Sequence, residues 1–131
     1  MRRKRREGSI SWYLYEIDKL FNPLITSLGY CQRCKSRNNI LQCSHVLPKG
    51  RYKSLRYNPV NVTCLCAGCH KWFWHESPLE ATEWFKTTFP ERWIYLTEAK
   101  KKITKMNIER YAEIFKMVII GDLKGLMKIA P

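Results

Sequence analysis

The chain has 131 residues, enough for one domain with a real hydrophobic core. Its 24 Lys and Arg against 11 Asp and Glu give a formal net charge of +13, which predicts a polyanionic partner. No apolar run approaches the ~18 residues of a membrane span, and the basic start lacks the apolar segment of a secretory signal. We therefore expect a cytoplasmic protein with no membrane partner.

The predicted elements begin with a basic tail at residues 1–8 and a helix over residues 9–28. Ser9 stands at an N-cap position, and apolar residues then recur at three- and four-residue steps, as on a helix with one buried face. Pro23 is expected to kink or split this helix. Residues 29–76 change to short segments broken by Cys, Asn, Pro and Gly, a texture typical of a motif organised by metal.

The remaining residues, 77–131, are predicted to form a helical extension. Start signals and proline positions favour helices over 79–89, 91–103 and 107–120, with Pro90 separating the first two. The aromatic residues of this part are more typical of core packing than of a base-stacking surface: Trp84, Phe85, Phe89, Trp93 and Tyr95.

Four of the six cysteines form two Cys-x-x-Cys pairs, Cys31 with Cys34 and Cys66 with Cys69. Each pair supplies two thiolates on a tight turn, as tetrahedral Zn²⁺ requires, and the missing export signal argues against disulfides. Four thiolates leave no open position for water, so the predicted zinc is structural. Cys43 and Cys64 are expected to be small buried hydrophobes, and either is an alternative ligand if this pairing is wrong.

Between and beside these cysteines, His45 ends a Leu-Gln-Cys-Ser-His segment, Asn61 follows an Arg-Tyr-Asn-Pro run, and His70 directly follows Cys69. In this order and spacing, residues 31 to about 75 resemble the HNH endonuclease family, with phage-borne members the most similar. The resemblance implies an α+β fold with a ββα-metal motif, in which a two-stranded hairpin and one helix are pinned by zinc and flanked by helices. A phage-encoded member would act in the cytoplasm of the bacterial host.

The family resemblance also implies catalytic roles. His45 would be the general base that activates water, Asn61 would support that base, and His70 would bind a catalytic Mg²⁺ or Mn²⁺. Ser44 stands where the family commonly has Asp or His, so it is expected to be a weak second ligand; the alternatives are coordination through water, reliance on His70 and phosphate alone, or binding without cutting. His75 lies some 140° around an α-helix from His70, which predicts that the two cannot share one ion.

Cations between His45 and Asn61 are expected to bind the nucleic-acid backbone: Lys49, Arg51, Lys53 and Arg56. The predicted function is therefore metal-dependent hydrolysis of phosphodiester bonds in DNA, with RNA left open, alongside phage replication, recombination or packaging proteins. The alternative is a noncatalytic, zinc-dependent nucleic-acid-binding module. Association with a membrane surface would explain the charge but not the spacing of His45, Asn61 and His70.

Overall fold

The computed structural model describes residues 3–102 and 104–129, so residues 1–2 of the expected tail and residue 103 of an expected helix lie outside the described residues. The described chain contains these regular elements: α1 (Ile10–Thr26), β1 (Leu41–His45), β2 (Val62–Cys66), α2 (Pro78–Thr88), α3 (Pro90–Ala99), α4 (Ile108–Ile120) and α5 (Leu123–Ile129). A π-helix, η3 (Cys69–His75), follows β2, and two short 3-10 turns, η1 (Lys53–Leu55) and η2 (Pro59–Asn61), precede it. Helices with one small antiparallel sheet confirm the α+β class.

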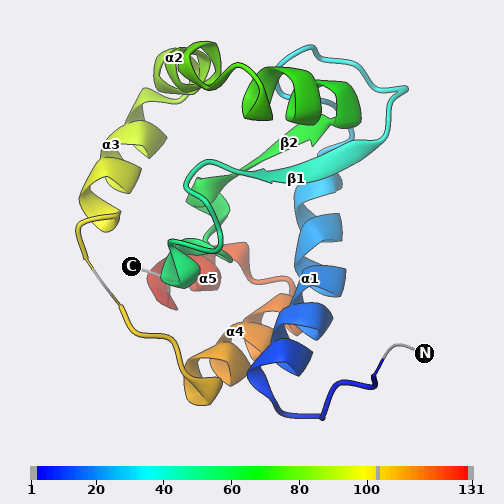
Figure 1. Cartoon of the computed structure of the whole chain (residues 1–131), viewed down its shortest axis with the longest axis vertical. Helices are drawn as coiled ribbons and strands as arrows, with labels where there is room; N and C mark the ends of the chain where they lie inside the picture. Colours follow the sequence, from blue (N-terminus) through cyan, green and yellow to red (C-terminus); the bar gives the residue numbers. More distant parts are fainter. Residues whose placement is uncertain (1–2, 103, 130–131) are drawn as a thin grey trace.

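The two strands cross the upper part of the view, α4 lies at the lower end, and α5 lies between them (Figure 1). Helix α1 runs along one side between these ends, and α2 and α3 follow the other side. The long connection between β1 and β2 extends into the middle of this arrangement. Within the described residues, no helix combines the length and the apolar character needed to cross a bilayer.

Helix α1 begins where the sequence predicts. The Ser9 hydroxyl accepts a hydrogen bond from the Trp12 backbone N–H at 3.3 Å, which satisfies one of the free donors of the first turn. Ile17 and Phe21 are fully buried. The helix runs on through Pro23 to Thr26, so the expected split does not occur.

The largest apolar cluster joins α1 to α4 and α5. Its buried members are Ile17, Phe21, Tyr57, Val62, Tyr111, Ile114, Val118 and Leu126. Asn107 caps the start of α4, and Gly121 ends it in the left-handed conformation at φ +71°, which glycine adopts without strain. This helix matches the prediction, whereas α5 lies within the expected helical extension but was not predicted as a separate helix.

The two strands pair antiparallel, with Cys43 opposite Cys64 and His45 opposite Val62. Every residue of β2 is buried, while β1 has an exposed and several half-buried side chains. The hairpin is thus covered along one strand and accessible along the other. This accessibility leaves His45, at the end of β1, close to the surface.

A second apolar cluster lies under α2 and α3, and it contains all five aromatic residues that were predicted to be core. Helix α3 ends at Ala99, earlier than expected. Arg92 of α3 reaches into this region and donates hydrogen bonds to the Val60 carbonyl at 2.8 Å and to the Pro59 and Val62 carbonyls. Burial lowers the pKa of Arg92 to about 10. Arg92 therefore holds η2, which ends at Asn61, and the start of β2 in place through their backbone carbonyls.

Candidate functional site

The two predicted cysteine pairs converge on one point. The Sγ atoms of Cys31, Cys34, Cys66 and Cys69 all lie within 4.8 Å of one another, and those of Cys34 and Cys66 are 3.8 Å apart. Four thiolates around one zinc at about 2.3 Å stand about 3.8 Å apart. The geometry therefore fits a single tetrahedral ion.

The electrostatics of this cluster also call for a cation. Burial alone would raise the pKa of Cys31, but hydrogen bonds from backbone groups of Cys34, Cys66 and Arg33 bring it to about 7. The pKa of Cys69 is raised to about 12, first by burial and then by the neighbouring thiols. Thiols this close cannot all ionise unless a positive ion neutralises them, and zinc would supply that charge.

The cluster also connects separate segments of the chain. Gln32 bonds Cys64 of β2 twice, through its backbone N–H at 2.8 Å and through its side-chain oxygen at 2.9 Å. The Arg33 guanidinium lies 3.8 Å from the centre of the Phe73 ring. Cys43 and Cys64 stay outside the cluster as packed, half-buried and buried residues, as predicted. A metal here would hold residues 31–34, β2 and η3 together.

The helix after the second cysteine pair differs from the expectation. Cys69–His75 is a π-helix, so its hydrogen bonds join residues five apart and its turn is wider than that of an α-helix. His70 and His75 therefore share a face, with Nε2 atoms 3.0 Å apart and ring centres 4.7 Å apart. The prediction that these two histidines point in different directions is wrong, because it assumed α-helical spacing.

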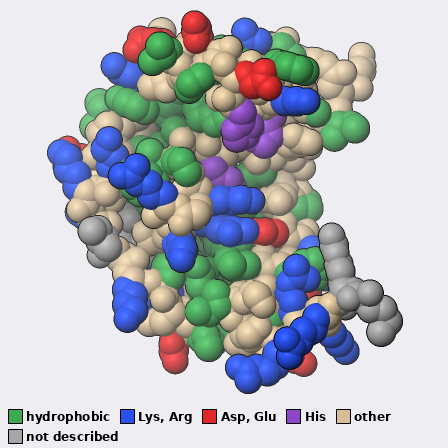
Figure 2. Space-filling view, viewed as in Figure 1, with side chains coloured by type: hydrophobic (Ala, Val, Ile, Leu, Met, Phe, Trp, Pro, Cys, Tyr) green, Lys and Arg blue, Asp and Glu red, His purple; other side chains and the backbone are tan. Residues whose placement is uncertain are grey.

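All three histidines of the chain line one pocket of about 350 Å³. His45 contributes from the end of β1, and His70 and His75 contribute from η3. Lys49, in the loop after β1, also lines the pocket. The histidines are visible on one face of the molecule, with Lys and Arg side chains gathered beside them (Figure 2). The lining of this pocket includes no acidic residue.

His45 is held in one tautomer. Its Nε2 lies 2.8 Å from the Arg56 carbonyl oxygen, which can only accept, so Nε2 carries the proton and Nδ1 keeps a lone pair. Burial, together with the positive charges of Lys49 and Arg56, outweighs this bond and lowers the pKa of His45 below its ordinary value of 6.5. The Trp74 indole N–H also fixes the backbone of His45, donating to its carbonyl at 3.0 Å. A neutral, oriented imidazole is the result.

His70 is oriented in a similar way. Its Nδ1 lies 2.8 Å from the Gln42 side-chain oxygen, so Nδ1 is the donor and Nε2, which faces His75, has the lone pair. Two nitrogens bound to one ion at about 2.1 Å are about 3.0–3.4 Å apart. The observed 3.0 Å between the two Nε2 atoms is therefore compatible with a shared metal.

Asn61 is fully buried and ties together the loop that follows β1. Its side-chain oxygen accepts from the Leu47 N–H at 2.8 Å, and its amide donates to the Leu47 and Leu55 carbonyls, each at 3.1 Å. It makes no direct bond to His45 among these contacts. Asn61 instead holds Leu55 in place, and the residue after Leu55, Arg56, orients His45 through its backbone carbonyl.

Ser44 does not join the histidines. It is fully buried, is absent from the lining of the pocket, and its hydroxyl has no hydrogen-bond partner within the described residues. The weak-ligand role expected for Ser44 is therefore not supported, because alternation along β1 turns its side chain away from that of His45. His75 lies in the pocket beside His70 instead.

The four cations expected to contact nucleic acid divide into three groups. Lys49 lines the histidine pocket, while Arg51 and Lys53 line a separate hollow. Arg56 has only 16 % of its side chain exposed and forms a 2.8 Å ion pair with Asp18 of α1. This position favours a structural role for Arg56, which anchors the loop, over the phosphate contact expected from the sequence.

Sequence reasoning missed Gln42 and Trp74 and rejected His75. Nothing in the local pattern distinguishes a π-turn from an α-turn, so the His70–His75 pairing carried no usable signal. Gln42 had only a weak signal: it is a polar residue in the strand that leads to His45, and its side chain is exposed.

Comparison of the chain with protein-family models, with curated proteins and with solved structures gave no match.

Proposed function

We propose that this protein is a metal-dependent endonuclease of the HNH type, which hydrolyses phosphodiester bonds in DNA. The observation that carries the proposal is the meeting of His45, His70 and His75 in one pocket on a cationic face. The order of His45, Asn61 and His70 in the sequence, which resembles that family, agrees with this placement. The cysteine cluster would be its structural zinc site.

In the proposed reaction His45 is the general base. Its Nδ1 has the lone pair, because Nε2 donates to the Arg56 carbonyl. The lowered pKa keeps that nitrogen unprotonated at neutral pH, so it can accept a proton from a water molecule in the pocket. That water attacks the phosphorus as its proton passes to His45, and the opposite bond, from phosphorus to the 3′ oxygen, breaks. The departing 3′ oxygen takes a proton from solvent and leaves as a hydroxyl, and the 5′ end keeps the phosphate.

His70 and His75 would hold the divalent metal through their Nε2 atoms. Gln42 keeps His70 in the required tautomer, and a shift of the His75 proton from Nε2 to Nδ1 frees the lone pair of its Nε2. When bound, such a metal neutralises the scissile phosphate and stabilises the departing oxygen. With two imidazoles and no carboxylate in the lining, the site should favour Mn²⁺ over Mg²⁺.

Lys49 is the cation best placed to attract the phosphate, because it lines the same pocket as the three histidines. Asn61 and the Arg56–Asp18 ion pair act further away, by fixing the loop that carries the Arg56 carbonyl. In this proposal they are positioning residues. Loss of Asn61 or of the Arg56–Asp18 ion pair should slow cleavage, because the Arg56 carbonyl would no longer hold His45 in its orientation.

Supercoiled plasmid DNA tests the proposal. The zinc-loaded wild type should convert it to nicked or linear forms when Mn²⁺ or Mg²⁺ is added, and His45→Ala should not. His70→Ala and His75→Ala should each raise the Mn²⁺ concentration needed for half-maximal cleavage. Lys116→Ala, which changes an exposed residue of α4, is the matched control and should leave cleavage unchanged.

The competing function is a noncatalytic, zinc-dependent module that binds nucleic acid. It is supported by Ser44, a neutral residue at the position where the HNH family commonly has an Asp or His metal ligand. In that case the plasmid would stay supercoiled with every metal. His45→Ala would bind DNA as tightly as the wild type, with no need for a divalent ion. Intact plasmid together with tight binding would therefore replace the nuclease by this alternative.

A further inference from the structure

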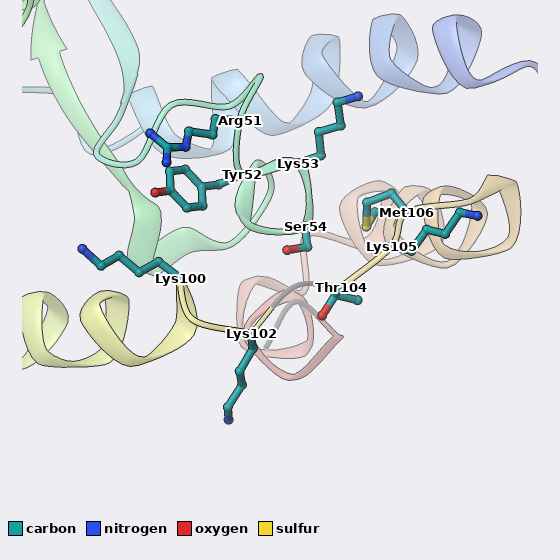
Figure 3. Close-up of a pocket in the computed structure, with 9 residues that line it drawn as sticks. All are labelled: Arg51, Tyr52, Lys53, Ser54, Lys100, Lys102, Thr104, Lys105 and Met106. Atoms are coloured by element: carbon teal, nitrogen blue, oxygen red, sulfur yellow. The ribbon is translucent and has the colours of Figure 1, made fainter.

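A second hollow, which we name the basic hollow, lies beside the histidine pocket. It has a volume of about 570 Å³ and lies between residues 51–54, after β1, and residues 100–102 and 104–106, between α3 and α4. Cationic side chains from both segments line it: Arg51, Lys53, Lys100, Lys102 and Lys105. Figure 3 shows the two segments facing each other across this space.

The charge of the basic hollow is not balanced by the protein. No acidic residue contributes to its lining, and none of its cations forms an ion pair within the described parts of the chain. Five cations without a carboxylate among the lining residues make this surface positive, and a positive surface attracts an anion with several charges. The lysines of residues 100–105 are not used by the proposed reaction in the histidine pocket.

The uncharged part of the lining indicates which anion fits. The Tyr52 ring lies between the cations, with the Arg51 guanidinium 5.5 Å from its centre. The hydroxyls of Ser54 and Thr104 also lie in the space between the two segments (Figure 3). An aromatic ring inside a cationic groove is the usual combination for an unpaired nucleic-acid strand, because bases stack on the ring while phosphates meet the cations.

The basic hollow and the histidine pocket are lined by consecutive residues of the loop after β1. Lys49 and Gly50 line the histidine pocket, and the next residue, Arg51, lines the basic hollow. A strand bound in the histidine pocket can therefore pass over Gly50 into the basic hollow. The concave shape suits a single strand better than a duplex, because the bases of a duplex are paired and cannot stack on an aromatic ring in the lining of the hollow.

We propose that the basic hollow binds an unpaired nucleic-acid strand next to the bond that the histidine pocket cleaves. This inference rests on the proposed nuclease function for the position of the cut, but the binding itself does not need cleavage. Lys100 and Lys105 contact phosphates, and Tyr52 stacks on a base. The preferred DNA therefore has an unpaired segment beside the cleaved bond.

Binding of a fluorescent 12-nucleotide single strand, measured by anisotropy in the His45→Ala background, tests the proposal. The Lys100→Ala/Lys105→Ala pair should weaken binding on the order of tenfold and reduce the slope of log K against log salt by about 1.4, or about 0.7 for each lost phosphate contact. Lys116→Ala/Lys124→Ala removes the same charge from exposed positions outside the basic hollow. This control pair should change neither value.

Tyr52 provides a second and independent readout. Tyr52→Ala should weaken binding of the single strand about 5- to 150-fold, whereas Tyr52→Phe, which keeps the ring, should bind as the parent does. A blunt duplex of the same length should be affected by neither change. Equal losses for both lysine pairs, or equal losses for duplex and single strand, would overturn the basic hollow as a strand site.

These outcomes separate the two proposals. A protein that binds the strand through Lys100, Lys105 and Tyr52 but never cuts DNA would overturn the nuclease and leave the strand site. A protein that cuts DNA in a His45-dependent way but binds single strands equally with and without these side chains would overturn the strand site alone.

Discussion

The two ends of this molecule are stabilised in different ways. At one end α1, α4 and α5 bury large apolar side chains against one another, among them Phe21, Tyr111 and Ile114. At the other end the hairpin and η3 share a small buried cluster in which three of the four members are cysteines. The histidine pocket belongs to this second end. We infer that the proposed active site depends for its shape on the zinc proposed for the cysteine cluster, while the helices depend on packing.

Removal of the metal should have the largest effect. Structural zinc in small sites contributes about 10–16 kcal/mol of binding free energy, which the cysteine end would lose. A zinc chelator, or Cys66→Ser, should therefore abolish amide protection in residues 31–34, β2 and η3, while α1 and α4 keep part of theirs. Hydrogen exchange followed by mass spectrometry measures both ends in one experiment.

Cys43→Ala is the control for that change, because Cys43 lies outside the cluster. It should retain one zinc per chain and the protection of the hairpin. Uniform loss of protection at both ends on zinc removal would show that the two ends are not stabilised separately.

The matching change at the helical end is Phe21→Ala. Phe21 is fully buried and packs edge-on against Tyr57 at 5.3 Å between ring centres, so its loss should lower the free energy of unfolding by about 3–5 kcal/mol. Leu20→Ala, at the exposed neighbouring position, should cost only about 0.5 kcal/mol. Denaturant unfolding gives both values, and the zinc content of folded Phe21→Ala should stay that of the wild type.

A smaller effect is expected where the two ends meet, at Asn61. Asn61→Ala leaves the Leu47 N–H and two carbonyls without their partner, which should cost about 2–4 kcal/mol and slow cleavage. The exposed amide of Asn39 offers a control, since Asn39→Ala should change stability by less than about 0.5 kcal/mol. A stable Asn61→Ala protein with full activity would refute the positioning role.

The smallest effect is a pH dependence. Burial lowers the pKa of His45, and the proposed base works only when neutral. Activity should therefore be flat between pH 7 and 8 and fall with acidification only below the ordinary histidine value of about 6.5. Initial cleavage rates at constant ionic strength measure this. A fall that begins above pH 7 would contradict the neutral state assigned to His45.

Much of the fold was predictable because its signals are local. Ser9 and Asn107 are caps, and the apolar steps after them gave α1 and α4 almost to the residue. The split considered at Pro23 does not occur, because packing of the surrounding turns against the core outweighs one lost helical hydrogen bond. Helix α5 was missed because its seven residues include Gly125 and have only a short apolar pattern.

The candidate site was predictable only in part. The spacing of the cysteines predicted their convergence, and the order of His45 and His70 gave the family resemblance on which their proposed roles rest. His75 and the basic hollow depend on geometry that no spacing reports, namely a π-turn and the approach of residues 51–54 to residues 100–102 and 104–106. Arg56 shows the reverse case, since a cation in a loop was read as a phosphate contact but is paired with Asp18.

The central claim is that His45 takes the proton of the water that attacks DNA. Single-turnover cleavage of end-labelled DNA by the zinc-loaded wild type and by His45→Ala, with saturating Mn²⁺, tests it most directly. We predict 5′-phosphate and 3′-hydroxyl ends and a rate that falls about 10²- to 10⁴-fold in the variant, with unchanged binding of DNA. Equal rates for the two folded proteins would contradict the claim.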